Sequence, residues 1–159
     1  MIIFQNLNNS VYFLKNICYN KKNVEKRRKW RMEQCRLTIT TVANGEESSI
    51  LRVGKMQLTP LSAQISYKEA DAIIHLSVEN NSAQIERKGD YTLSLPLREK
   101  QLCKGRIGIM GSEGDVEVFA HKVSYSISRN SLLLSLHYDL IFGEEKQEMK
   151  LRILSRLNR

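Results

Sequence analysis

The sequence predicts an all-β protein that folds as a single closed, up-and-down antiparallel barrel of about 8–10 strands. Three observations predict it: apolar residues recur at every second position from Gln34 onward, short turn-forming segments separate these runs, and no helix of normal length can be read between them. Strict alternation is typical of strands with one face buried and the other in water. So many strands would leave exposed edges in an open sheet, which favours closure into a barrel over a sandwich.

The alternating runs follow one another along the chain, each with apolar side chains on one face and polar side chains on the other. Their apolar members are, in order, Leu37 and Ile39; Ala63, Ile65 and Tyr67; Ile74, Leu76 and Val78; Tyr91, Leu93, Leu95 and Leu97; Leu132, Leu134, Leu136, Tyr138, Leu140 and Phe142; and Met149, Leu151 and Ile153. Each run is expected to form one strand with its apolar face toward the core.

Turn-forming residues lie between the runs. The expected turns are Ala43-Asn44-Gly45-Glu46, Glu79-Asn80-Asn81-Ser82, Lys88-Gly89-Asp90, Gly111-Ser112-Glu113-Gly114-Asp115, Arg129-Asn130-Ser131 and Gly143-Glu144-Glu145. Asn-Gly and Asn-Asn pairs tolerate positive φ, as tight hairpins require. Because each connection is short, sequential strands are expected to pair as a meander.

Two irregularities predict bends. Between Val116 and Ser128 the apolar parity flips, which requires a bulge or bend near Phe119 to Lys122. The apolar stripe is also blurred around Gly54. Bends of this kind let a long antiparallel sheet coil and close on itself.

The basic charge is concentrated at the start of the chain. Residues 1–31 hold eight basic residues against one acid, Glu25, so they carry +7 of the net charge of +8. The codons AAA AGG AGG AAA TGG AGA ATG can encode Lys26 to Met32, and they contain a purine-rich bacterial ribosome-binding sequence just before a start codon. We therefore expect residues 1–31 to be a disordered leader or translated upstream sequence, and residues 32–159 to be the barrel domain. The alternative is a basic arm that binds nucleic acid or anionic lipid.

The sequence predicts a cytoplasmic protein without a membrane anchor. The apolar patch from Val11 to Ile17 is far shorter than the ~20 residues of a spanning helix. Basic residues follow this patch instead of preceding it, the wrong order for a secretory signal. Cys18, Cys35 and Cys103 have no paired spacing, so neither a disulfide framework nor a zinc knuckle is predicted.

Three segments carry a resemblance to a known family. They are Ser62-Ala63-Gln64-Ile65-Ser66-Tyr67-Lys68-Glu69, Ile85-Glu86-Arg87-Lys88-Gly89 and Ser131-Leu132-Leu133-Leu134-Ser135-Leu136-His137-Tyr138-Asp139-Leu140. With them the chain resembles the YwiB-like family of small bacterial proteins of unknown function, over about Arg36 to Ile153. The resemblance implies a calycin-like, lipocalin-type barrel in the bacterial cytoplasm and a domain that starts near Met32. The family has no agreed catalytic residues to carry over.

Arg87 is the residue that most suggests a ligand. It shares a strand face with apolar residues, so its guanidinium should point inward or lie at the barrel rim. A buried unpaired charge costs several kcal/mol, so Arg87 requires a carboxylate, carbonyl oxygens or an anionic ligand. Tyr67, Tyr125 and Tyr138 also lie on apolar faces and can supply hydroxyls. These four residues are the predicted site for a small amphipathic acid; the alternative is a rim arginine satisfied by backbone, with the tyrosines in the core.

The sequence gives little support for a metal site, a cofactor site or a catalytic site. His75, His121 and His137 lack ligand spacing within a strand, so no metal is predicted. No P-loop, nucleophile elbow or glycine fingerprint between a strand and a helix is present, so we predict no cofactor and no catalytic residues.

Three classes of function remain. The first is a barrel that binds a small ligand. The second is a protein-interaction or homodimerising module, for which the outward apolar residues Leu133, Ile141 and Phe119 are the evidence. An enzyme ranks last, and nucleic-acid binding depends on the leader alone.

Overall fold

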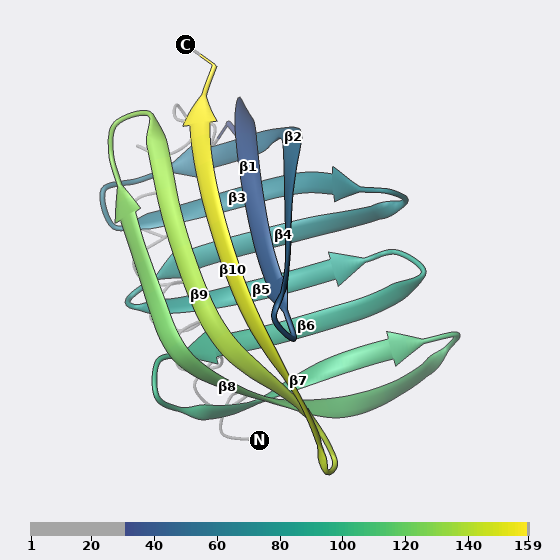
Figure 1. Ribbon diagram of the computed structural model, residues 1–159. Helices are drawn as coiled ribbons and strands as arrows, with labels where there is room; N and C mark the ends of the chain where they lie inside the picture. The colour runs from purple at the N-terminus through teal and green to yellow at the C-terminus, as the bar shows by residue number, and fades with distance from the viewer. Residues whose placement is uncertain (1–30, 159) are drawn as a thin grey trace, which may run out of the picture. The chain divides into compact units, whose positions relative to one another are not determined.

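A computed structural model of the chain describes residues 31–158 (Figure 1). The expectation for the leader, residues 1–31, concerns positions that lie, except for Arg31, outside the described residues. Within residues 31–158 there is no helix of the length and apolarity that a bilayer crossing requires.

The described part of the chain is built from strands. They are β1 (Glu33–Ala43), β2 (Glu46–Leu58), β3 (Ser62–Glu69), β4 (Ala72–Glu79), β5 (Ser82–Lys88), β6 (Tyr91–Arg98), β7 (Leu102–Ile109), β8 (Ser112–Ile127), β9 (Ser131–Phe142) and β10 (Glu145–Leu157). Each strand pairs antiparallel with the next, and β10 pairs with β1 to close the barrel. The predicted all-β class, meander and closure are confirmed. In Figure 1, β1, β9 and β10 cross steeply in front of β3–β6.

The tight turns follow the predicted chemistry with one exception. Asn44 and Gly45 have φ of 50° and 84°, and Asn80 and Asn81 have φ of 50° and 57°, as two-residue hairpins of the primed type require. The predicted turn over 111–115 is wrong in its extent, because β8 already begins at Ser112. The residues at the start of β8 are exposed and polar, so they give no apolar alternation by which a strand could be recognised.

Both predicted irregularities are present. The pairing of β8 with β9 shifts register between Ala120 and Lys122, which leaves His121 as the extra residue of a bulge. Around Gly54 the chains approach closely: a Cβ atom there would lie 2.5 Å from the backbone oxygen of Ser66. The apolar stripe of β2 is blurred because Arg52 occupies an inward position opposite Leu37.

The interior is filled with apolar side chains. Leu37 of β1, Leu95 of β6 and Leu134 of β9 are all at most 1% exposed. Among the described residues the only buried polar or charged ones are Asp139 and Ser155. Burial of this apolar surface is the main favourable term that holds the barrel together.

Candidate functional site

Alternate turns of a meander lie at the same end of the barrel. We define the mouth as the end that carries the β1–β2, β3–β4, β5–β6, β7–β8 and β9–β10 turns. The β2–β3, β4–β5, β6–β7 and β8–β9 turns lie at the opposite end. This division decides which of the predicted site residues come together.

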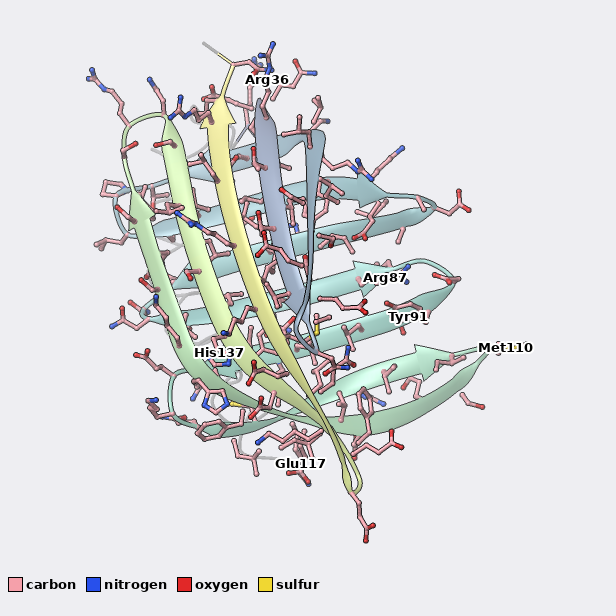
Figure 2. All side chains as sticks on the ribbon, viewed as in Figure 1. Arg36, Arg87, Tyr91, Met110, Glu117 and His137 are labelled. Carbon is pink, nitrogen blue, oxygen red and sulfur yellow. The ribbon has the colours of Figure 1, made fainter. Side chains whose placement is uncertain are left out.

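Arg87 lies at the mouth, on the inward register of β5, with its side chain 16% exposed. Its Nη1 donates to the backbone oxygen of Tyr91 at 2.8 Å, and its Nη2 lies 2.8 Å from Oδ1 of Asp90. The guanidinium carbon is 3.7 Å from the centre of the Tyr91 ring, close enough for a cation–π contact. Figure 2 shows Arg87 and Tyr91 side by side where β5 and β6 meet their turn. The hydrogen bond from Arg87 lowers the pKa of Asp90.

Tyr67 and Tyr138 belong to the same end. Both are 6% exposed and lie on inward registers of β3 and β9. Burial raises the pKa of Tyr138 to about 12, with a further contribution from Tyr91. Burial also raises the pKa of Tyr67 above its usual value, with contributions from Glu69 and Tyr138. Tyr138 is therefore electrostatically linked to both Tyr67 and Tyr91.

Tyr125 lies at the opposite end of the barrel. Its hydroxyl accepts a hydrogen bond from the backbone N–H of Asn81, in the β4–β5 turn, at 3.3 Å. The structure therefore places Arg87, Tyr67 and Tyr138 at the same end of the barrel and Tyr125 at the other end. Counting turns from Tyr67 to Tyr125 along the meander would have placed them at opposite ends.

Sequence reasoning missed Tyr91 as a site residue. It shares the inward face of β6 with Leu93 and directly follows the β5–β6 turn. Both signals were readable, because an inward residue directly after the β5–β6 turn must lie near the inward residue Arg87 directly before it.

Two grooves lie beside the mouth turns, mainly over the outer face of β5–β8, with volumes of about 390 and 420 Å³. Both are lined by Gly89, Thr92, Gly108 and Glu113. The larger groove also includes Arg87. A Cβ atom on Gly108 would lie 2.4 Å from Oγ1 of Thr92, so glycine keeps this surface hollow.

A separate polar cluster lies on the outer face around the β8 bulge. Oδ2 of Asp139 is 2.6 Å from Nε2 of His121 and 3.2 Å from Nζ of Lys146. The His121 and His137 rings are in contact, with centres 4.6 Å apart and planes tilted by 34°. Burial alone would raise the pKa of Asp139, but hydrogen bonds from His121 and Lys146 outweigh it and lower the pKa. Within residues 31–158 no three His, Cys, Asp or Glu side chains are arranged to hold a metal ion.

The cysteines of the described region are free thiols. Cys35 is buried on the inward face of β1, and burial raises its pKa. A neutral buried thiol of this kind packs as a small hydrophobic side chain. Cys103 is half-buried on β7.

These features define a small antiparallel barrel with an apolar interior and a polar, tyrosine-rich mouth. The chain belongs to DUF1934, a domain of unknown function whose model matches residues 34–153. Among solved structures the chain is similar to the crystal structure of the ywiB protein from Bacillus subtilis, with a TM-score of 0.67 and 13% sequence identity. The alignment covers 80% of this chain and 93% of that chain. No curated protein matches the chain.

The predicted YwiB-like family is confirmed: the family match shows the membership, and the Bacillus structure shows the shared fold. The family match begins at residue 34, two residues after Met32, and thus lies within the predicted barrel domain. At 13% identity the Bacillus structure shows a shared fold and nothing more.

Proposed function

We propose that the protein binds a small anionic, amphipathic molecule at the mouth of its barrel. The observation that carries this proposal is the inward-facing guanidinium of Arg87, at the same end as the phenols of Tyr67, Tyr91 and Tyr138. A guanidinium presents five donors in a planar fork. In Arg87, Nη1 contacts the backbone oxygen of Tyr91 and Nη2 contacts Asp90. Phenol hydroxyls add neutral hydrogen-bond donors at the same end of the barrel.

The contact with Asp90 supports recognition of an acid. The Asp90 side chain is 78% exposed, so its carboxylate contacts the Arg87 guanidinium from the solvent side. A ligand carboxylate or phosphate can take the same position, because exposed ion pairs contribute little stability and exchange readily. The Tyr91 ring meanwhile fixes the plane of the guanidinium. Asp90 therefore acts as an internal competitor for the ligand.

The ligand is expected to lie at the mouth. The inward positions deeper in the barrel are occupied by apolar side chains such as Leu95 and Leu134. An apolar portion of the ligand would lie against the inward side chains next to Arg87, such as Leu93.

Binding, and not catalysis, is the proposed role. Tyrosines whose pKa is raised stay protonated at neutral pH and make poor general bases. An always-charged guanidinium cannot exchange protons either. We place this role in the bacterial cytoplasm, because free thiols such as Cys35 and Cys103 are typical of a reducing compartment.

Titration of the full chain with the anionic, amphipathic dye 1-anilinonaphthalene-8-sulfonate tests the proposal. Arg87→Gln is expected to weaken saturable dye binding at least about tenfold, the loss of one charged hydrogen-bonded contact. Asp90→Asn should strengthen binding, because it removes the competing carboxylate. Arg98→Gln is the matched control, an exposed arginine at the opposite end of β6. Equal affinities for the Arg87 and Arg98 variants would contradict the proposal.

A second candidate function is a surface for a protein partner. Leu51, Leu154 and Leu133 lie in one row across the outer face of β2, β10 and β9, with Thr38 of β1 between the first two. These leucines are 75%, 38% and 38% exposed. Of the residues expected to form such a surface, Leu133 is exposed, whereas Phe119 and Ile141 are half-buried. The row ends at the edge of β2.

A further inference from the structure

In the part of the chain that the structure describes, one half of β2 has a strand neighbour on one side only. Residues 46–53 pair with β1, from Glu46 opposite Ala43 to Val53 opposite Arg36. The pairing of β2 with β3 covers only Gly54 to Leu58. Among the described residues, Glu46–Val53 therefore forms a free edge about 26 Å long, at 3.3 Å per residue. Its first four residues are exposed, and Leu51 and Val53 are 75% and 61% exposed.

The turn that precedes β2 determines which backbone groups face this edge. A two-residue hairpin joins β1 to β2, so the flanking pair of Ala43 and Glu46 is hydrogen-bonded, and bonded and non-bonded pairs alternate from there. The odd-numbered residues from 47 to 53 consequently direct their N–H and C=O groups to the free edge. The guanidinium of Arg52 donates to the backbone oxygen of Leu51 at 2.9 Å, as expected for a carbonyl without a strand neighbour.

We propose that this edge pairs antiparallel with the same edge of a second copy of the chain, about a twofold axis at Ser49. In this register each odd residue that faces the edge meets another odd residue: Ser49 lies opposite Ser49, and Glu47 opposite Leu51. Three hydrogen-bonded pairs give about six backbone hydrogen bonds. A twofold axis perpendicular to the sheet keeps the outer faces of both barrels on one side.

Charge selects this register and this partner. It places Glu46 of each copy opposite Arg52 of the other, so the symmetry creates two cross-strand pairs of opposite charge. A shift by two residues puts Arg52 opposite Ser48 and loses both pairs. Inward-facing charges on an edge strand normally prevent pairing with unrelated strands. On β2 the acidic residue Glu46 comes first and the basic residue Arg52 comes last, so the charges of two antiparallel copies of the strand are complementary.

Cross-linking tests the register directly. In the full-length chain, Ser49→Cys places two thiols on a hydrogen-bonded pair with Cα atoms about 5.5 Å apart, within the range that a disulfide spans. Mild oxidation is expected to give a covalent dimer. The matched control is Ser126→Cys, an exposed outward position on β8, and the unmodified chain gives the background from its own cysteines. Equal cross-linking of the two variants would overturn the proposed register.

A charge swap tests the pairing without a covalent bond. Sedimentation equilibrium of the full chain is expected to show a dimer. Glu46→Arg is expected to raise the dissociation constant of this dimer by at least about tenfold. Adding Arg52→Glu to Glu46→Arg reverses both pairs and should restore dimerisation, which a merely structural effect would not do. A parent chain that stays monomeric at 100 µM, or a double variant no better than the single one, would overturn the proposal. Neither result decides whether a ligand binds at the mouth, which is tested at Arg87.

Discussion

Leu134 and Leu133 are neighbours on β9 that should respond very differently to the same substitution. Leu134 is 1% exposed and faces the interior between Tyr125 and Ile153, whereas Leu133 faces outward and is 38% exposed. Truncation of a well-packed leucine to alanine costs about 2.7–5.0 kcal/mol, the more so when the surroundings cannot collapse. Strand β9 is hydrogen-bonded on both sides, which restrains collapse, so Leu134→Ala is expected to cost about 3 kcal/mol.

The cost for Leu133→Ala should be much smaller. Full burial of a leucine is worth about 1.5–3 kcal/mol, and Leu133 is only partly covered, so we expect about 1 kcal/mol. Urea denaturation of the full chain measures both values from the shift in midpoint at constant slope. In thermal unfolding, the interior substitution should lower Tm by about 12 °C and the outward one by about 4 °C.

Two results would refute this reasoning. A cost below about 1 kcal/mol for Leu134→Ala would mean that the interior has free space, as in a hollow ligand-carrying barrel. Equal costs for the two variants would mean that the assigned faces of β9 are wrong.

Three further predictions concern other parts of the barrel. The pKa of Asp139 is lowered in the folded protein, so its contribution to stability is present above its unfolded value of about 3.9 and is lost as pH falls through the folded pKa. Asp139→Asn should therefore flatten the loss of stability below pH 4, and an unchanged acid limb in urea titrations would contradict this assignment. Gly45 has φ of +84°, so Gly45→Ala should cost about 1 kcal/mol by urea denaturation, and a neutral effect would argue against the primed turn. Tyr125→Phe removes the acceptor for the Asn81 N–H and should cost about 1 kcal/mol without changing dye binding; a change in dye affinity would link Tyr125 to the mouth after all.

The barrel was predictable because signals within single strands and short turns determine it. Alternation along Ala63, Ile65 and Tyr67 indicates which face is buried, and the positive-φ pair at Asn44 and Gly45 sets a register that continues through the ladder. Each short turn forces the next strand to lie beside the last. Fold class, strand order and the bulge at His121 follow from such signals.

The site was predictable only in part, because parity indicates a face but not an end of the barrel. Tyr67 and Tyr125 share inward parity, yet they lie at opposite ends. The burial of Asp139 was missed for a different reason. It occupies an outward position, where the pattern predicts exposure, and it is covered by side chains from β8 and β10 that only the closed barrel brings together.

The most direct test of binding at the mouth is native mass spectrometry of the full-length protein purified from its own cells, beside the Arg87→Gln and Arg98→Gln variants. We predict a co-purifying small anionic molecule on the parent chain and on the Arg98 variant, and its loss from the Arg87 variant. Bare masses for all three chains, or the same bound molecule on all three, would contradict the account.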